Sequence, residues 1–149
     1  MSFEGWSIRR LERRDEDAWR GLWDAYLDFY RAEIPPEVTA ATFTRLCSDG
    51  GDLVGYVAAD ESDTPVGFAH VVFHPSTWSG TSYCYLEDLY VAPSARGGDT
   101  ARALIAKVYE EADRRSSTRV YWITQEYNAP ARSLYDTVAH RASFAVYER

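Results

Sequence analysis

A glycine-containing turn between a predicted strand and a predicted helix is the segment best suited to chemistry. The strand covers residues 82–91, Gly97 and Gly98 lie in the turn, and the helix begins near Ala101 without bulky residues. The first N–H groups of a helix lack intrahelical partners, and together with the helix dipole they attract phosphate. Glycine lets a ligand approach the backbone closely. The turn is therefore a candidate phosphate site, with an ordinary turn as the alternative, since neither GxxxxGK[ST] nor GxGxxG is present.

Histidine and cysteine spacing does not indicate a metal centre. His70 and His74 are four residues apart, which suits a metal on a helix, but the segment HVVFH is β-branched and is predicted as strand. Four strand residues span about 13 Å, too far for one shared ion. His140 has no partner, and Cys47 and Cys84 form neither metal-ligand spacing nor a disulfide framework. We expect no metal, and two reduced thiols of the kind found in the cytoplasm.

The elements that would position the turn follow one another within a single domain, residues 1–149. The clearest helix follows Asp15, a candidate N-cap, because apolar residues recur at helical spacing until Pro35. Strands alternate with helices in an order that favours a mixed sheet with helices on its faces. Strands are predicted over 6–10, 53–59, 66–73, 82–91, 119–124 and 143–149, and three further helices over 38–48, 101–114 and 128–137.

Composition excludes several classes of protein. The chain has 149 residues, of which 46% are hydrophobic and 26% charged, as in an ordinary globular domain. The net charge of −7 disfavours general binding of nucleic acid. No stretch approaches the ~18 consecutive apolar residues of a membrane span, and the N-terminus lacks the apolar core of a signal peptide. We expect a cytoplasmic protein with no membrane partner.

The negative charge is concentrated in the first half of the chain. Residues 1–75 carry about twice as many acidic as basic side chains, whereas residues 76–149 are balanced. A solvated acidic face is one explanation. The other is that the first half receives a cationic ligand.

The glycine turn and the strand LEDLYV before it resemble motif A of the GCN5-related N-acetyltransferases (GNAT), whose turn reads [RQ]-x-x-G-x-[GA]. The residues that take the pattern here are Arg96, Gly97, Gly98, Asp99, Thr100 and Ala101.

A later stretch, WITQEYNAPARSLYD, is similar to motif B of the same family. Asn128 and Tyr135 occupy its two telling positions, and their seven-residue spacing places them on one helix face. The similarity in element order covers nearly the whole chain. Within the family, the chain resembles the polyamine and histone acetyltransferase-like group, which shares the LED strand.

The resemblance implies an α/β fold of one GNAT domain. Its mixed sheet is expected to be mostly antiparallel, with six to seven strands, a central splayed parallel pair and about four helices. The co-substrate would be acetyl-CoA. Its pantetheine would pair with the backbone of Leu89, Tyr90 and Val91, its pyrophosphate would rest on the amides of residues 96–101, and Asn128 would meet the pantetheine arm. A homodimer is expected on the same grounds.

The chemistry of acetyl transfer to an amine assigns further roles. An alkylammonium has a pKa near 10.4 and must lose a proton before it attacks. Glu87 is the candidate base, because Tyr85 and Leu89 on its own strand face would desolvate the carboxyl group and raise its pKa. The alternative is that the carboxylate of Glu87 only holds the ammonium or a backbone group. Tyr135 is the candidate acid for the departing thiolate, with a core tyrosine as the alternative.

The acceptor pocket is assigned to residues near the end of the first helix and on the LED strand. Tyr30 and Glu33 lie just before Pro35, and strand alternation is expected to point Asp88 away from the face that carries Glu87. The expected acceptor is a small cationic primary amine. Acetylation of a protein or peptide, and a CoA-binding module without turnover, are the alternatives.

Asp99 is the one departure from motif A, which has glycine at this position. Its carboxylate could cap the following helix and occupy the amides that a phosphate needs. Alternatively it points to water and leaves those amides free, and we favour this second orientation.

Overall fold

A mixed six-stranded sheet in the order β1-β2-β3-β4-β5-β6 forms the centre of the computed structural model, which describes residues 2–3 and 6–149. Neighbouring strands from β1 to β5 pair antiparallel, and β5 and β6 pair parallel. Because β1 has two residues, the sheet consists essentially of the five strands β2 to β6. The strands are β1 (Ser2–Phe3), β2 (Trp6–Arg10), β3 (Leu53–Ala59), β4 (Pro65–His74), β5 (Tyr83–Val91) and β6 (Arg119–Tyr121).

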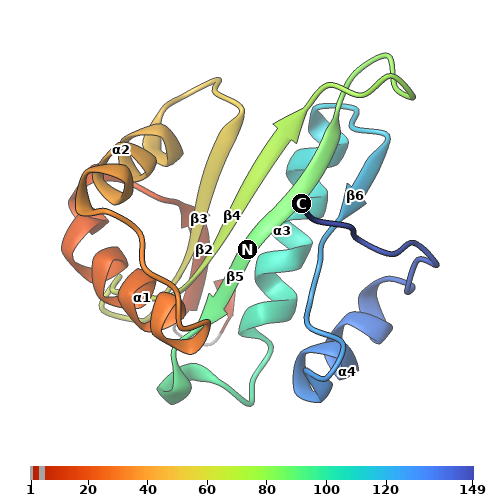
Figure 1. Ribbon diagram of the computed structural model, residues 1–149. Helices are drawn as coiled ribbons and strands as arrows, with labels where there is room; N and C mark the ends of the chain where they lie inside the picture. The colour runs from red at the N-terminus through yellow and green to blue at the C-terminus, as the bar shows by residue number, and fades with distance from the viewer. Residues whose placement is uncertain (1, 4–5) are drawn as a thin grey trace.

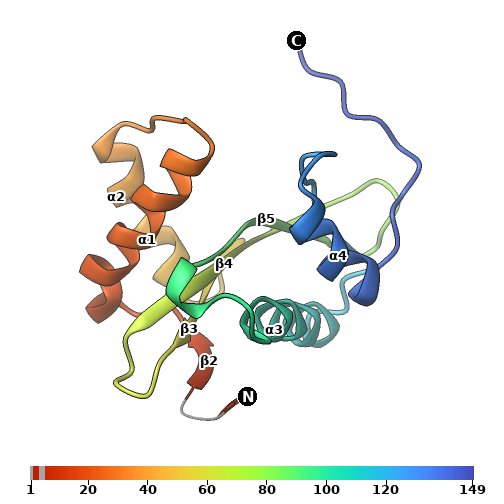
Figure 2. The ribbon, with the colours of Figure 1, turned by 90° about the horizontal axis from the view of Figure 1, so that it is seen from below.

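Helices cover both faces of this sheet. The helices are α1 (Glu16–Phe29), α2 (Pro36–Cys47), α3 (Thr100–Arg114) and α4 (Ala129–Val138). Figure 1 shows α1 and α2 over one face, and the view of Figure 2 places α3 on the other face, with α4 beside it. Each face has its own core. Trp19 and Trp23 of α1 and Phe43 of α2 are buried against one face, and Leu104 and Val108 of α3 are buried against the other.

Asp15 holds α1 against β2. It takes the predicted N-cap position of α1, but its carboxylate accepts no capping bond from that helix. It accepts instead from the guanidinium of Arg9, with two N–O distances of 2.8 Å, and from the backbone N–H of Glu12 at 2.8 Å. Burial would raise the pKa of Asp15, and the hydrogen bonds from Arg9 and Glu12 outweigh burial and lower it. A buried ion pair therefore fixes where α1 begins.

The parallel pair of strands is short. Tyr83, Cys84 and Tyr85 of β5 lie opposite Arg119, Val120 and Tyr121 of β6. After Tyr121 the chain leaves the sheet, although the sequence predicted strand as far as residue 124, and runs down to α4 (Figure 1). The lower part of β5 is consequently paired on one side only within the described residues.

A β-bulge interrupts the pairing of β5 with β4. Val71 lies opposite Leu86 and His70 lies opposite Asp88, so Glu87 is the extra residue on β5. A bulge places two residues of one strand against one of its partner and ends the strict alternation of faces. The prediction that Asp88 points away from the face of Glu87 is therefore wrong.

The fold class is as predicted, a single α/β unit with a mixed, mostly antiparallel sheet and four helices, and two details differ. The stretch 143–149 forms no strand, and Phe144, Val146 and Tyr147 are exposed. Alternating apolar residues favour a strand, but a strand also needs a neighbour, and in Figure 2 the chain after α4 runs away from the sheet. The splayed pair β5–β6 therefore lies at the edge of the described sheet and not at its centre.

None of the helices in the described ranges has the length and apolar character needed to cross a bilayer.

Candidate active site

A small cavity of about 30 Å³ opens where β5 and the chain after β6 diverge. Four of the predicted site residues meet around it: Tyr30, Glu87, Leu89 and Tyr135. A cavity of this size holds about one water molecule. The walls come from four segments far apart in sequence: Tyr26 and Tyr30 of α1, Leu86, Glu87 and Leu89 of β5, Trp122, Ile123 and Thr124 after β6, and Tyr135 of α4.

The bulge places a second carboxylate, Asp88, next to the cavity wall formed by Glu87, although Asp88 is not itself one of the walls. Glu87 lines the cavity beside Tyr26, and Asp88 accepts a hydrogen bond of 2.9 Å from the hydroxyl of the same tyrosine. Burial raises the pKa of Glu87, and the negative charge of Asp88 raises it further. Glu87 therefore has the surroundings of a proton acceptor whose pKa is tuned upward.

The tyrosines around the cavity are held in their protonated form. Burial raises the pKa of Tyr135 to about 12, and burial followed by the charge of Asp88 raises the pKa of Tyr30. The ring of Tyr135 meets Trp122 edge-on, with 5.3 Å between centroids. Tyr26 meets Tyr30 at 4.9 Å. Phenol groups that keep their protons can donate hydrogen bonds toward the cavity at neutral pH.

The free edge of β5 fits the backbone pairing expected of pantetheine. Leu89, Tyr90 and Val91 pair with β4 on one side, and no described strand pairs with them on the other. Arg96 lies across the end of this edge, where its Nε donates to the carbonyl oxygen of Val91 at 2.8 Å and its guanidinium lies 5.4 Å from the Tyr90 ring centroid. A ligand that pairs with Val91 must displace this hydrogen bond.

The turn before α3 fits a phosphate. Gly97 has φ +89°, a conformation that other residues rarely adopt, and α3 begins at Thr100 with its amides directed at the turn. Asp99 is at the N-cap position but makes no capping bond, and its side chain is 76% exposed, 3.8 Å from Arg102. Of the two orientations considered, the structure has the one that points to water. The turn also borders a hollow of about 460 Å³ lined by Arg96, Gly98, Asp99 and Thr100 together with Trp6 and Ile8.

Two predicted site residues belong neither to the walls of the cavity nor to β5 or the turn before α3. Asn128 caps α4, and its side chain accepts a hydrogen bond of 3.4 Å from the backbone N–H of Ala131. Glu33 is exposed between α1 and α2 and is not among the cavity's walls. Conversely, Tyr26 and Trp122 line the cavity and were not predicted to. Tyr26 fits the apolar stripe of α1 and was interpreted as core, and Trp122 lies in a stretch that was predicted as strand.

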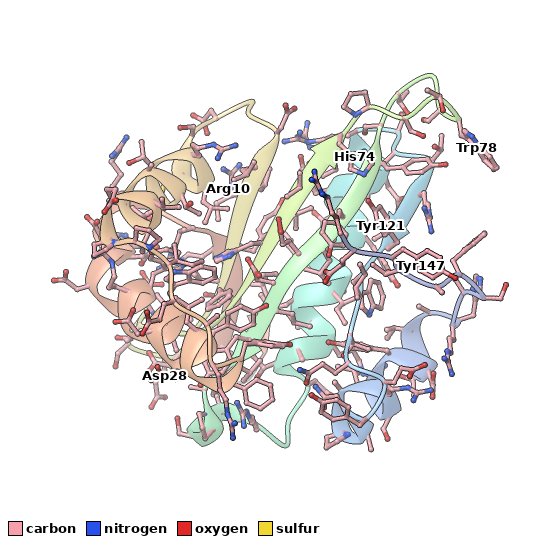
Figure 3. All side chains as sticks on the ribbon, in the orientation of Figure 1. Arg10, Asp28, His74, Trp78, Tyr121 and Tyr147 are labelled. Atoms are coloured by element: carbon pink, nitrogen blue, oxygen red, sulfur yellow. The ribbon has the colours of Figure 1, made fainter. Side chains whose placement is uncertain are left out.

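Both strand histidines are engaged by other side chains. His70 is buried and bonded to Trp19 and Asp88. His74 contacts the Tyr121 hydroxyl at 2.7 Å, and both residues are labelled in Figure 3. Across residues 2–3 and 6–149, no three His, Cys, Asp or Glu side chains are grouped to hold a metal ion. Cys47 and Cys84 are free thiols.

Comparison with known proteins decides the family. Residues 10–139 match the model of the Acetyltransferase (GNAT) family. The chain belongs to this family. A D-amino-acid N-acetyltransferase of Saccharomyces cerevisiae is 38% identical over 143 residues, which are 95% of this chain and 89% of that protein. The chain is accordingly an N-acetyltransferase.

Two further GNAT comparisons are informative. A thialysine N-epsilon-acetyltransferase of Caenorhabditis elegans is 37% identical over 76 residues, 51% of this chain and 47% of that protein. The structure of AAC(6')-Iy in complex with a CoA-based bisubstrate analogue has a TM-score of 0.83, with 20% identity and 98% of each chain covered. At that identity the likeness shows the fold alone.

The exposed carboxylate at the phosphate turn leads to the first prediction. Asp99→Asn and Asp99→Gly should each tighten binding of CoA about three- to tenfold, equivalent to about 0.7–1.4 kcal/mol. Removing a negative charge favours the pyrophosphate, and the gain is limited because solvent screens an exposed turn. Calorimetric titration with CoA at low salt measures the effect.

Asp113→Asn is the matched control, since it removes the same charge from the opposite end of α3, about 20 Å away. Weaker or unchanged CoA binding in both Asp99 variants would show that this carboxylate does not oppose the cofactor.

Proposed function

We propose that this GNAT enzyme transfers the acetyl group of acetyl-CoA to the primary amine of a small cationic acceptor. The observation that supports this most directly is the position of Glu87 in the wall of a cavity lined by tyrosines, beside the free edge of β5, with Asp88 next to it and hydrogen-bonded to the cavity tyrosine Tyr26. A pair of carboxylates attracts an ammonium group, and aromatic walls contribute cation–π attraction. The relatives are named for acetylation of D-amino acids and of thialysine, both small amines.

Glu87 is the group proposed to take the proton from the acceptor. The ammonium has a pKa near 10.4, so it stays protonated at pH 7 until a base removes the proton. Bound acetyl-CoA supplies an acetyl thioester that the free amine can attack. Burial and the charge of Asp88 raise the pKa of Glu87, which makes its carboxylate a stronger base than an exposed glutamate. Asp88, with its hydrogen bond from Tyr26, holds the positive charge of the acceptor.

Tyr135 is proposed to assist the leaving sulfur. With a pKa of about 12 it keeps its proton at neutral pH. Full transfer to a thiolate, whose thiol has a pKa of about 8.5, would be uphill by about 5 kcal/mol. Its contribution is therefore a hydrogen bond that stabilises the developing negative charge on sulfur.

The homodimer and the cytoplasmic location remain predictions. The exposed apolar side chains of Phe144, Val146 and Tyr147 favour a contact with another chain. Figure 2 shows the chain after α4 running away from the sheet, and Tyr147 of this segment is labelled in Figure 3.

The proposal is tested by following acetyl-CoA consumption with a panel of amines: thialysine, spermidine, D- and L-amino acids of both charges, and lysine peptides. The expected result is the highest kcat/KM with small cationic amines, falling as salt screens the attraction over about 8–10 Å. A preference for peptides or anionic amines would show that the acceptor is not a small cationic amine. Binding of CoA without consumption of acetyl-CoA with any amine would indicate a module without turnover.

Replacement of Tyr135 tests its role in the departure of sulfur. Tyr135→Phe should lower kcat about 10²-fold, the effect of losing one donor to a developing anion, with unchanged affinity for CoA. The control is Tyr127→Phe, which alters a phenol that is 80% exposed and lies eight residues earlier, before α4 begins. A loss of less than threefold in the Tyr135 variant would remove this residue from the chemistry.

The pH profile tests the base. Glu87 must be ionised to act, so kcat/KM should fall on the acidic side at a pH above the ordinary glutamate value of about 4.3. The other ionisable groups facing it are Tyr26 and Tyr30 on α1, His70 on β4, Tyr85 and Asp88 on β5, Tyr121 on β6 and Tyr135 on α4.

Asp88→Asn should shift this acidic limb to lower pH, because it removes a negative charge that raises the pKa of Glu87. Glu87→Gln should abolish the limb along with most activity. An acidic limb that stays in place in Asp88→Asn, or one that persists in Glu87→Gln, would assign the limb to another group.

A further inference from the structure

Four side chains form a hydrogen-bonded chain behind the cavity. The indole Nε1 of Trp19 lies 2.9 Å from Nε2 of His70, and Nδ1 of His70 lies 2.9 Å from Oδ2 of Asp88. The hydroxyl of Tyr26 contacts the other oxygen, Oδ1, at 2.9 Å. Trp19 is 0% exposed and His70 is 3% exposed, whereas the side chain of Asp88 is 17% exposed. The chain thus runs from the core under α1 to the edge of the cavity.

The partners of His70 determine where its proton lies. An indole N–H can only donate, so Nε2 of His70 must be the acceptor and carries no hydrogen. The single proton of the neutral imidazole is therefore on Nδ1, and it is donated to Asp88. The ring is stacked on Phe68 with 4.3 Å between centroids and an interplanar angle of 10°, and Trp23 lies at 5.3 Å. Turning the ring over would break both hydrogen bonds in a packed interior.

This arrangement fixes the orientation of Asp88. Oδ2 accepts from His70 and Oδ1 accepts from Tyr26, so each carboxylate oxygen is held by a donor from another element. Each oxygen keeps a second lone pair for another donor. The bulge on β5 sets this carboxylate beside Glu87. Neither His70 nor Asp88 is among the walls of the cavity, but Asp88 lies next to Glu87, which is, and its side chain is 17% exposed whereas His70 is buried. A ligand at this site can therefore reach Asp88 but not His70.

We propose that His70 is a positioning residue for acceptor binding: Trp19 fixes its Nδ1-protonated tautomer, and His70 holds Asp88 as an oriented carboxylate that receives the ammonium of the acceptor. The inference rests on the role given to Asp88 in the proposed function. In this proposal His70 affects acceptor binding without touching either substrate. The role also explains why a histidine occupies a core position where an apolar side chain would otherwise pack.

Two amide variants separate this role from packing alone. In His70→Asn the amide nitrogen replaces Nδ1 and can still donate to Asp88, while Trp19 loses its acceptor. In His70→Gln the amide reaches the Nε2 position and can accept from Trp19, while Asp88 loses its donor. The two variants therefore remove one hydrogen bond each, from opposite ends of the same ring.

The expected result is a difference in acceptor KM. With thialysine or spermidine as acceptor, His70→Gln should raise KM about 10- to 100-fold, the range for a lost hydrogen bond to a charged group. His70→Asn should stay within about threefold of the unchanged protein. The KM for acetyl-CoA should change in neither variant. His74→Gln, on the same strand, is the control, and urea unfolding of each variant monitors stability.

Each outcome has one interpretation. Equal acceptor KM values in the Asn and Gln variants, or losses that follow stability and affect both substrates alike, would overturn the positioning role. Asp88→Asn is measured alongside them. If it leaves acceptor KM unchanged, the acceptor role of Asp88 in the proposed function is wrong and the inference falls with it. If Asp88→Asn raises acceptor KM and His70→Gln does not, only the role of His70 is overturned.

The tautomer can be measured without any variant of His70. In ¹⁵N-histidine-labelled protein, the ring nitrogens of the three histidines are observed directly by NMR. His74→Gln and His140→Gln identify the remaining signals as those of His70. An Nδ1-protonated, neutral ring is expected, and an Nε2-protonated or doubly protonated ring would overturn the inference even if the kinetic variants failed to fold.

Discussion

The unpaired lower edge of β5 is the constraint on which the site depends. Backbone N–H and C=O groups inside a protein need partners. β4 supplies them along one side of β5, but β6 supplies them on the other for three residue pairs only. At the end of the edge, Arg96 bonds the carbonyl of Val91. The same divergence that leaves this backbone free also opens the cavity, so the place for a ligand and the groups that can pair with it have one origin.

Aromatic packing takes over where sheet pairing stops. Tyr109 of α3 donates to the carbonyl of Val138 at 2.8 Å, and its ring lies 6.4 Å from Trp122. Trp122 in turn meets Tyr135 edge-on. These contacts anchor α4 against α3 without a continuous strand between them. Tyr135 consequently faces the cavity from a helix that the sheet does not hold directly.

Local patterns in the sequence predicted the kinds of element but not their interruptions. The helical spacing of apolar residues after Asp15 predicts α1, and the turn before α3 was identified by its glycines. No residue type marks the bulge at Glu87, because it depends on how β4 and β5 are paired, and strict alternation therefore placed Asp88 on the wrong face. The stretch 143–149 failed as a strand for a related reason, since pairing requires a neighbour that its own residues cannot supply.

The same distinction applies to charge. Composition left two explanations for the acidic first half of the chain, a solvated face or a surface that receives a cation. Its acidic residues Asp24, Asp28 and Glu33 are exposed to solvent, and Glu87 and Asp88 come from the balanced second half. Exposed charges separated by more than about 8–10 Å are screened by salt and act mainly on the rate of encounter. Asp88 is 17% exposed and hydrogen-bonded to Tyr26 and His70, so its charge is screened less than that of a fully exposed carboxylate, whereas Glu87 lines the cavity but is itself exposed. The acidic first half is therefore suited to attract a cationic acceptor, and two carboxylates placed by a bulge are suited to hold it.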